Sequence, residues 1–180
     1  MALRRIVRFP EPFLRQPTVA VTKFDDDLRR LVDDMAETMY ASNGAGLAAI
    51  QVGDPRRVFI VEASVAGGEE NDPPRVFINP KIEWLSDETE TSDEGCLSFP
   101  TIYVPVKRSL RARVRALDLD GKEFVAEGEA LYARAMQHEN DHLVNKLLID
   151  FVGPLKKQMI KRKLERLTQE EIDDAVAAGE

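Results

Sequence analysis

The chain has 180 residues, of which 43% are hydrophobic and 32% are charged, and its formal net charge is −7. This composition is typical of a globular protein with a hydrophobic core, and the length suits a single domain over residues 1–180. The composition excludes collagen-like and disordered chains. The chain has no run of about 18 apolar residues, so we predict no membrane-spanning helix.

The acidic balance argues against a general binder of DNA or other nucleic acids. The basic N-terminus has no apolar segment after it, so we do not expect a secretory signal. A single cysteine cannot form an internal disulfide bond, which favours a reducing, cytoplasmic location.

The first predicted element is a helix from Asp25 to Tyr40. Its apolar residues recur at the three- and four-residue spacing of one helical face. The acids Asp25–Asp27 suit the N-cap and first turn, where the helix dipole favours negative charge. The next segment, GAGLAAIQ at residues 44–51, lacks the preceding strand and final glycine of a dinucleotide-binding loop, and by itself it predicts a tight loop.

Short strands are predicted in the middle of the chain. Residues 110–116 alternate apolar residues with arginines, which predicts a strand with one basic, solvated face. Asp120-Gly121 predicts a hairpin turn after this strand. The predicted strand segments are Val58–Val61, Phe77–Ile78, Ile82–Leu85, residues 110–116 and residues 123–127.

Two helices are predicted toward the C-terminus. The first covers Leu131–Val144, and the second opens at Gly153-Pro154 and forms a basic helix over residues 154–167. The acidic tail, residues 168–180, is expected either to form a separate helix capped by Thr168 with Glu171 or to fray. The predicted fold class is α+β, with small antiparallel β-sheets packed around the helix at residues 131–144 and a C-terminal helix.

The predicted helix at residues 131–144 carries the sequence H-E-x-x-H. His138 and His142, the only histidines, are four residues apart and lie about 6 Å apart on one helical face. Both imidazoles can therefore reach one metal ion, and Glu139 can act as general base toward a metal-bound water. Two surface histidines on a helix are the alternative interpretation.

A catalytic metal site needs three protein ligands and one open position. The third ligand could be a carboxylate, another histidine or a thiolate. The only cysteine, Cys96, lies in the segment EGCLS beside a glycine that permits close backbone approach. A lone cysteine is more often an inert buried residue, but the two-histidine helix favours ligation. Gln51 offers a neutral amide donor that suits an oxyanion.

Three segments, GAGLAAIQ, EGCLS and QHENDH, resemble in this order the signature motifs of peptide deformylases. The resemblance covers about residues 3–168. It implies a metal-dependent hydrolase that removes the formyl group from the N-terminal formylmethionine of newly synthesised polypeptides. It also implies metal ligation by Cys96, His138 and His142. The native metal would be Fe²⁺, with Ni²⁺, Co²⁺ or Zn²⁺ as substitutes.

The same resemblance implies the catalytic and substrate-binding residues. Glu139 would take a proton from the metal-bound water and pass it to the leaving amine. Gln51 and the backbone N–H of Leu97 would stabilise the oxyanion of the formyl group. Gly44 and Gly46 would pair with the substrate backbone, and the enzyme would act as a monomer.

The chain departs from the usual family pattern in two places. Asn145 stands where glycine is usual, and we expect a left-handed backbone there, which asparagine tolerates. Tyr103 stands where some bacterial members have arginine, near the entrance of the methionine pocket. We expect Arg134 and Ala135, one turn before His138, to face this pocket.

Six lysines and arginines lie within residues 156–166. A solvated helix face is the plain interpretation, whereas the resemblance implies docking near the ribosomal exit tunnel. Two alternatives to a deformylase are a zincin-type metallopeptidase, for which we find no downstream third ligand, and a ribosome-associated binding protein without activity. The second predicts a damaged motif, but the residues of the motif are all present.

Overall fold

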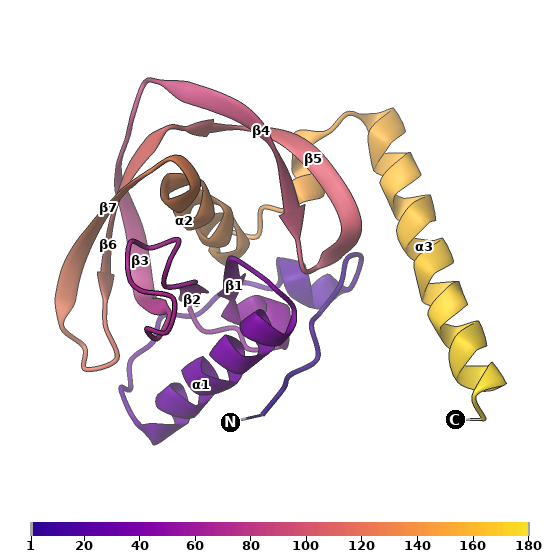
Figure 1. Cartoon of the computed structure of the whole chain (residues 1–180), viewed down its shortest axis with the longest axis horizontal. Helices are drawn as coiled ribbons and strands as arrows, with labels where there is room; N and C mark the ends of the chain where they lie inside the picture. Colours follow the sequence, from indigo (N-terminus) through magenta and orange to yellow (C-terminus); the bar gives the residue numbers. More distant parts are fainter. Residues whose placement is uncertain (1, 180) are drawn as a thin grey trace.

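The computed structural model describes residues 2–179 and shows an α+β fold with two antiparallel sheets and a C-terminal helix (Figure 1). No helix within these residues is long and apolar enough to cross a membrane. The elements in chain order are η1 (Pro12–Arg15), α1 (Asp26–Ala41), β1 (Gly46–Ala48), η2 (Ala49–Val52), β2 (Val58–Val61), β3 (Arg75–Leu85), β4 (Thr89–Cys96), β5 (Phe99–Ser109), β6 (Arg111–Leu117), β7 (Glu123–Glu129), α2 (Ala130–Leu143), η3 (Leu148–Phe151) and α3 (Pro154–Ala177).

The strands form one sheet in the order β1-β2-β3-β6-β7 and a separate two-stranded sheet, β4-β5. Helix α2 lies among these strands, and its buried face joins the hydrophobic core of the larger sheet (Figure 1). Helix α1 packs its apolar stripe against β1, η2 and β2. The end of β4, the start of β1 and one face of α2 are thereby brought to the same part of the molecule.

Helix α1 begins as predicted. Asp25 is its N-cap, and the Asp25 carboxylate accepts a hydrogen bond of 3.0 Å from the Leu28 backbone N–H. This bond satisfies one of the amide groups that have no partner within the helix, and such a cap contributes about 1 kcal/mol. The apolar residues at three- and four-residue spacing are buried, as the periodicity predicted.

Two sequence predictions in the first half of the chain were wrong. The GAGLAAIQ segment is not only a tight loop, because residues 46–48 form strand β1 and pair with β2 before the short helix η2. The break expected at Asn79-Pro80 lies inside the continuous strand β3. Asn79 adopts a left-handed φ of 49°, and the pairing with β6 shifts register just after it. A bulge therefore replaces the predicted strand end.

The β6–β7 hairpin confirms the predicted alternation of apolar residues with arginines. It also confirms the turn at Asp120-Gly121, in which Gly121 has a φ of 76°. The exposed face of β6, however, is not simply basic. Arg113 pairs with Glu127 at 2.6 Å, and Arg115 pairs with Glu83 and with Glu123. The face carries mixed charges because β3 and β7 present acids beside these arginines.

The prediction of a separate or frayed C-terminal tail was wrong. Helix α3 continues without a break from Pro154 to Ala177, so the basic segment and most of the acidic tail belong to one helix. Thr168 does not cap a new helix: its hydroxyl donates to the Leu164 carbonyl, four residues earlier in the same helix. Figure 1 shows α3 along one side of the molecule, where Ile160 and Leu164 fix it to the core.

Candidate active site

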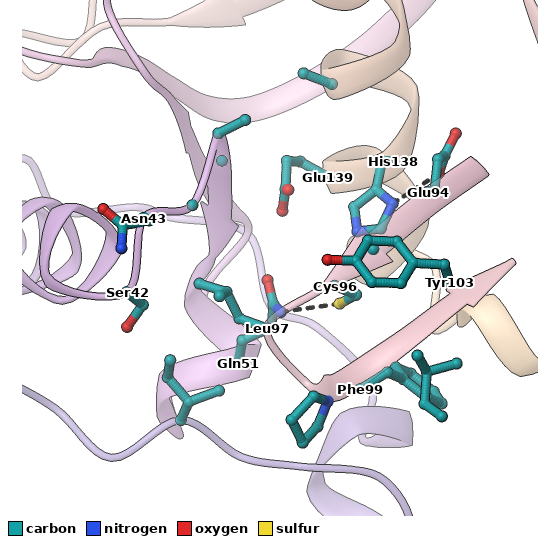
Figure 2. Close-up of a pocket in the computed structure, with 18 of the residues that line it drawn as sticks. Ser42, Asn43, Gln51, Glu94, Cys96, Leu97, Phe99, Tyr103, His138 and Glu139 are labelled. Atoms are coloured by element: carbon teal, nitrogen blue, oxygen red, sulfur yellow. Dashed lines mark hydrogen bonds and ion pairs between the residues drawn. The ribbon is translucent and has the colours of Figure 1, made fainter. Parts of the chain in front are cut away.

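Cys96, His138 and His142 come together in the structure, although Cys96 lies more than 40 residues away in the sequence. Their possible ligand atoms all lie within 4.8 Å of one another. Cys96 is the last residue of β4, and its Sγ lies 3.4 Å from His142 Nε2. The two histidines follow each other on one face of α2, with ring centroids 5.2 Å apart. The grouping predicted from the sequence is therefore present, and Figure 2 shows two of its members, Cys96 and His138.

A thiolate and two imidazoles form a donor set that suits a divalent transition metal. His142 is buried, and burial followed by the charges of His138 and Arg108 moves its pKa well below the usual value. The neutral form that a metal ligand requires is therefore favoured at His142. Its Nδ1 has no hydrogen-bond partner among residues 2–179. The three donors fit a metal ion.

Glu94 fixes the orientation of His138. The Glu94 carboxylate lies 2.9 Å from His138 Nδ1, which leaves Nε2 as the nitrogen directed toward Cys96 and His142. In the metal-free protein, burial lowers the pKa of His138, but its bonds with Cys96 and Glu94 outweigh burial and hold the pKa well above the usual value, so a metal ion would have to displace that proton to bind His138. Such an outer carboxylate sets the tautomer and ring orientation of a metal-binding histidine.

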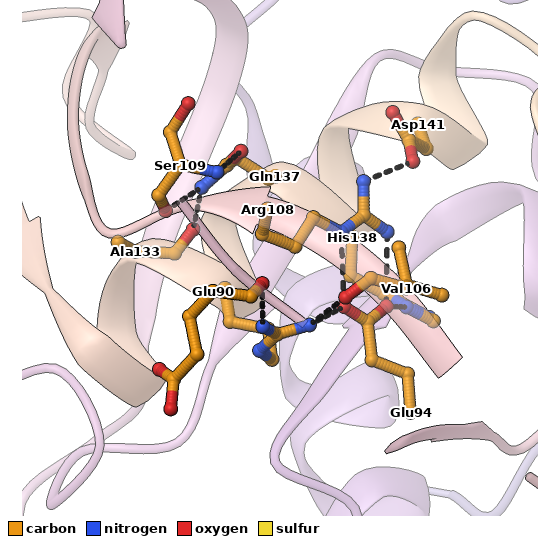
Figure 3. A network of polar contacts seen from close by, with 10 residues as sticks. Glu90, Glu94, Val106, Arg108, Ser109, Ala133, Gln137, His138 and Asp141 are labelled. Atoms are coloured by element: carbon orange, nitrogen blue, oxygen red, sulfur yellow. Dashed lines mark hydrogen bonds and ion pairs between the residues drawn. The ribbon is translucent and has the colours of Figure 1, made fainter. Parts of the chain in front are cut away.

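Two arginines hold Glu94 in turn (Figure 3). Arg108 donates two hydrogen bonds of 2.9 Å to the Glu94 carboxylate and one of 2.6 Å to Asp141, and Arg134 donates another of 2.6 Å to Glu94. Burial would raise the pKa of Glu94, but hydrogen bonds from Arg108 and His138 overcome it and lower the pKa to about 2. Glu94 is therefore an anion at any pH at which an enzyme normally works.

The sequence analysis missed the roles of Glu94 and Arg108. One signal was available, because residues two apart on a strand face the same side. Glu94 and Cys96 share β4, so an acid on the cysteine's side of this strand was a candidate neighbour of the metal site. Nothing local marks Arg108, which reaches Glu94 only because β4 and β5 pair.

Glu139 lies beside the three donors in a protected position. It is buried, and burial raises its pKa to about 7. Its Oε2 has no hydrogen-bond partner within residues 2–179, and the side chain lines the cavity. A carboxyl group with a pKa near neutrality can both accept and donate a proton during one reaction.

Gly46 makes room for this carboxylate. A Cβ atom at position 46 would lie 2.8 Å from Glu139 Oε1 and 3.0 Å from Glu139 Cγ. At Gly44, a Cβ would lie 3.0 Å from the Leu97 side chain. The two glycines thus allow the β1 segment to approach α2 and the end of β4 closely.

Gln51 is held with its amide nitrogen toward the site. Its Oε1 accepts a 2.9 Å hydrogen bond from the Ala48 backbone N–H, while its Nε2 donates to Ser98 Oγ at 3.0 Å and lies 3.4 Å from Cys96 Sγ. Leu97 follows Cys96 directly and also lines the cavity (Figure 2). Both residues predicted to stabilise an oxyanion are therefore beside Cys96.

A cavity of about 630 Å³ opens above these groups. Arg134 and Ala135 line it, as predicted, but the Arg134 guanidinium is bonded to Glu94 and to the carbonyls of Val106 and Glu90. Tyr103 stands at the rim with 68% of its surface exposed. The volume of the cavity is large enough to hold a side chain.

Asn145, the other departure from the family pattern, adopts the expected left-handed conformation with a φ of 60°. Its side-chain amide donates a 2.7 Å hydrogen bond to the Gln16 carbonyl. Asparagine thus ends the turn after α2 in place of glycine and ties that turn to the N-terminal segment.

The chain is similar to known proteins over most of its length. A sequence model described as Polypeptide deformylase matches residues 3–158. A peptide deformylase from Saccharophagus degradans is 49% identical over 166 residues, which cover 92% of this chain and 94% of that protein. One from Maricaulis maris is 43% identical over 97% of this chain and 99% of its own length.

Solved structures show the same similarity. The crystal structure of a peptide deformylase from Legionella pneumophila superposes with a TM-score of 0.88 at 38% identity, over 95% of this chain and 98% of that one. A peptide deformylase from Ehrlichia chaffeensis in complex with actinonin gives a TM-score of 0.85 at 36% identity, over 92% and 98% of the two chains. Neither the metallopeptidase nor the inactive binding protein finds support in these comparisons.

Proposed function

Because the chain belongs to the polypeptide deformylase family, whose members remove the formyl group from N-terminal formylmethionine, we propose that Cys96, His138 and His142 hold its catalytic metal. Peptide deformylases are metal-dependent enzymes, and the three donors lie within 4.8 Å of one another. A divalent cation bound there supplies Lewis acidity, which makes water nucleophilic near neutral pH. We propose Fe²⁺ as the native metal, with Ni²⁺, Co²⁺ or Zn²⁺ as substitutes.

Glu139 is the proposed general base and acid. Its carboxylate takes a proton from the attacking water and delivers this proton to the amine that leaves when the C–N bond of the formamide breaks. Three observations support the role: its burial, its pKa near 7, and the absence of a hydrogen-bond partner for Oε2 in the described part of the chain. One residue can perform both transfers because its pKa lies near the pH of the reaction.

Gln51 and the backbone N–H of Leu97 are the proposed donors to the formyl oxygen. Gln51 is suited to this role because Ala48 and Ser98 hold its amide in one orientation, so little reorganisation is needed as charge develops on the oxygen. Gly44 and Gly46, at the cavity wall, are the proposed partners of the substrate backbone.

The observation that carries this proposal is the convergence of the three donors with Glu139 and Gln51 beside one open cavity, which Cys96, His138, Glu139 and Gln51 line. We expect the iron-loaded protein, purified without oxygen, to release one formate per molecule of formyl-Met-Ala-Ser. A chelator should abolish the release, and added Fe²⁺ should restore it. Enzymatic detection of formate measures this reaction directly.

Mass spectrometry of the same mixture tests the competing peptidase chemistry. Intact Met-Ala-Ser should be the only peptide product, and acetyl-Met-Ala-Ser should stay unchanged because the family's reaction removes a formyl group. Cleavage of the Met-Ala bond, or no formate from fully loaded protein, would contradict the proposal.

A cytoplasmic location and a monomeric state stay predictions. So does docking of α3 near the ribosomal exit tunnel, which its run of lysines and arginines supports. We expect the intact protein to sediment with ribosomes at low salt and to dissociate at high salt. A chain ending at Gly153 should not sediment, provided that circular dichroism shows it folded, since Ile160 and Leu164 are buried. Equal, salt-insensitive sedimentation of both chains would exclude docking through α3.

A further inference from the structure

A second cavity, of about 360 Å³, lies between β5 and helix α3. We call it the α3 groove and define it by residues 101–103 on the β5 side and by residues 156–166 of α3. Met159 and Ile160 give it an apolar lining. The catalytic groups described above do not reach it.

The α3 groove adjoins the active-site cavity along one segment of β5. Thr101, Ile102 and Tyr103 line both of them. Thr101 has a left-handed φ of 63°, and the pairing of β4 with β5 shifts register across this stretch. Lys163 fixes α3 to the same segment through a 3.4 Å contact from Nζ to the Thr101 carbonyl. The two cavities therefore lie on either side of the same short segment of β5, so a chain that leaves the active site past Tyr103 comes next to the groove.

The groove is strongly cationic in a protein of net charge −7. Its α3 side presents four exposed basic side chains, and no ion pair engages any of them within residues 2–179. They are Lys156, Arg162, Lys163 and Arg166. Unpaired cations that line a groove create a positive potential, which favours an anionic ligand.

The length of this cationic row suits a short peptide. Lys156 and Arg166 are ten residues apart on one helix, so their backbone positions are separated by about 15 Å. An extended peptide covers this distance with about four or five residues. The exposed Met159 lies between the two ends and offers an apolar contact to the same ligand.

We propose that the α3 groove binds an acidic stretch of the formylated polypeptide, several residues after the formylmethionine. This inference rests on the proposed function, because the substrate delivers the stretch. A peptide already held in the active site presents its downstream residues at a high effective concentration, so several weak ion pairs suffice. The shared residues 101–103 place the groove directly beside the active-site cavity, which favours the substrate itself over a separate ligand such as RNA.

Two nine-residue substrates test the proposal. Formyl-Met-Ala-Ser-Gly-Gly-Glu-Asp-Glu-Glu is compared with its neutral counterpart, in which Gln and Asn replace the acids. At low salt we expect KM to be about tenfold lower for the acidic peptide, as two to four surface ion pairs would give, with similar kcat. The preference should fall toward one at high salt because the ion pairs are exposed.

Paired variants with equal charge changes locate the effect. In Arg162→Gln/Arg166→Gln the ratio of kcat/KM between the acidic and neutral peptides should fall to about one. In Lys157→Gln/Lys161→Gln, on the same helix but outside the groove, the ratio should stay near that of the unchanged protein. Arg162→Lys/Arg166→Lys keeps both charges and should restore the preference.

Direct binding separates this inference from the deformylase activity. Fluorescence anisotropy follows the same two peptides without the formyl group and with a C-terminal dye, so it needs no turnover. Tighter binding of the acidic peptide that depends on Arg162 and Arg166 supports the groove even if formate release fails. Equal binding and equal KM of the two peptides would overturn the inference. Binding of an RNA oligonucleotide at these arginines, without acidic preference, would overturn it in favour of nucleic acid.

Discussion

Replacing Glu139 with glutamine is expected to lower kcat about a thousandfold, within the range that a positioned general acid–base contributes. Glutamine keeps the shape of the side chain but cannot take a proton from water. Gly46 leaves space for the glutamate, and an isosteric amide fits the same space. Because Glu139 is not among the proposed ligands, metal content should stay near normal, as elemental analysis of the purified variant would show.

The control for this variant is Glu129→Gln, which makes the same chemical change at an exposed position beside the start of α2. Its kcat should stay close to that of the unchanged protein. If Glu139→Gln lost the metal together with its activity, Glu139 would be a structural part of the metal site, and the two roles that we assign to it would be wrong.

The same variant has a signature that does not depend on turnover. The pKa of Glu139 rises from the ordinary 4.5 to about 7 because burial disfavours the charged form. The folded metal-free protein therefore holds a proton that the unfolded chain releases, and its stability falls as pH rises from about 4.5 to about 7. This shift corresponds to roughly 3 kcal/mol. Urea unfolding of the metal-free Glu139→Gln variant should lack that part of the pH dependence.

The parts of the site that follow from local geometry could be predicted from the sequence. The spacing of His138 and His142 fixes their common face as soon as the segment is helical, and Glu139 follows from the same short segment. Cys96 joined them in the prediction because a third ligand was lacking and because the EGCLS segment resembles a family motif. Its actual position depends on the pairing of β4 with β5 and on the packing of β4 near α2.

The missed features depend on contacts between elements. The sequence predicted a substrate-binding role for Gly46 and gave no sign of a second feature that the structure shows, the space that Gly46 leaves for the Glu139 carboxylate. The direction of the Arg134 guanidinium, toward Glu94 and two carbonyls, is set by β4 and β5 and is not encoded in the helix. Helix α3 continues beyond Thr168 because its helical hydrogen bonds continue there. The predicted cap of a new helix by Thr168 with Glu171 does not form.

Replacing Glu94 with glutamine is expected to weaken both the metal site and the fold. An amide has no charge to hold Arg108 and Arg134, whose side chains are only 7% and 12% exposed. Arg108 keeps Asp141 and Arg134 keeps its two carbonyl acceptors. Both arginines nevertheless lose their shared buried carboxylate, and breaking a buried ion pair costs up to about 3–5 kcal/mol, so the melting temperature should fall. His138 also loses the carboxylate that orients its ring, and metal affinity should drop by about 10- to 100-fold.

The matched control is Glu90→Gln, an exposed carboxylate on the same strand, β4, which should change neither quantity. Acid titration adds an independent measurement. Because the pKa of Glu94 is lowered to about 2, its stabilising effect is complete above about pH 4.5 and is lost as pH falls through about 2. The unchanged protein should lose stability over that interval, and Glu94→Gln should lose less. If Glu94→Gln kept normal metal affinity but lost stability, Glu94 would serve the fold alone. If Glu94 orients the His138 ring, metal affinity and stability must both fall.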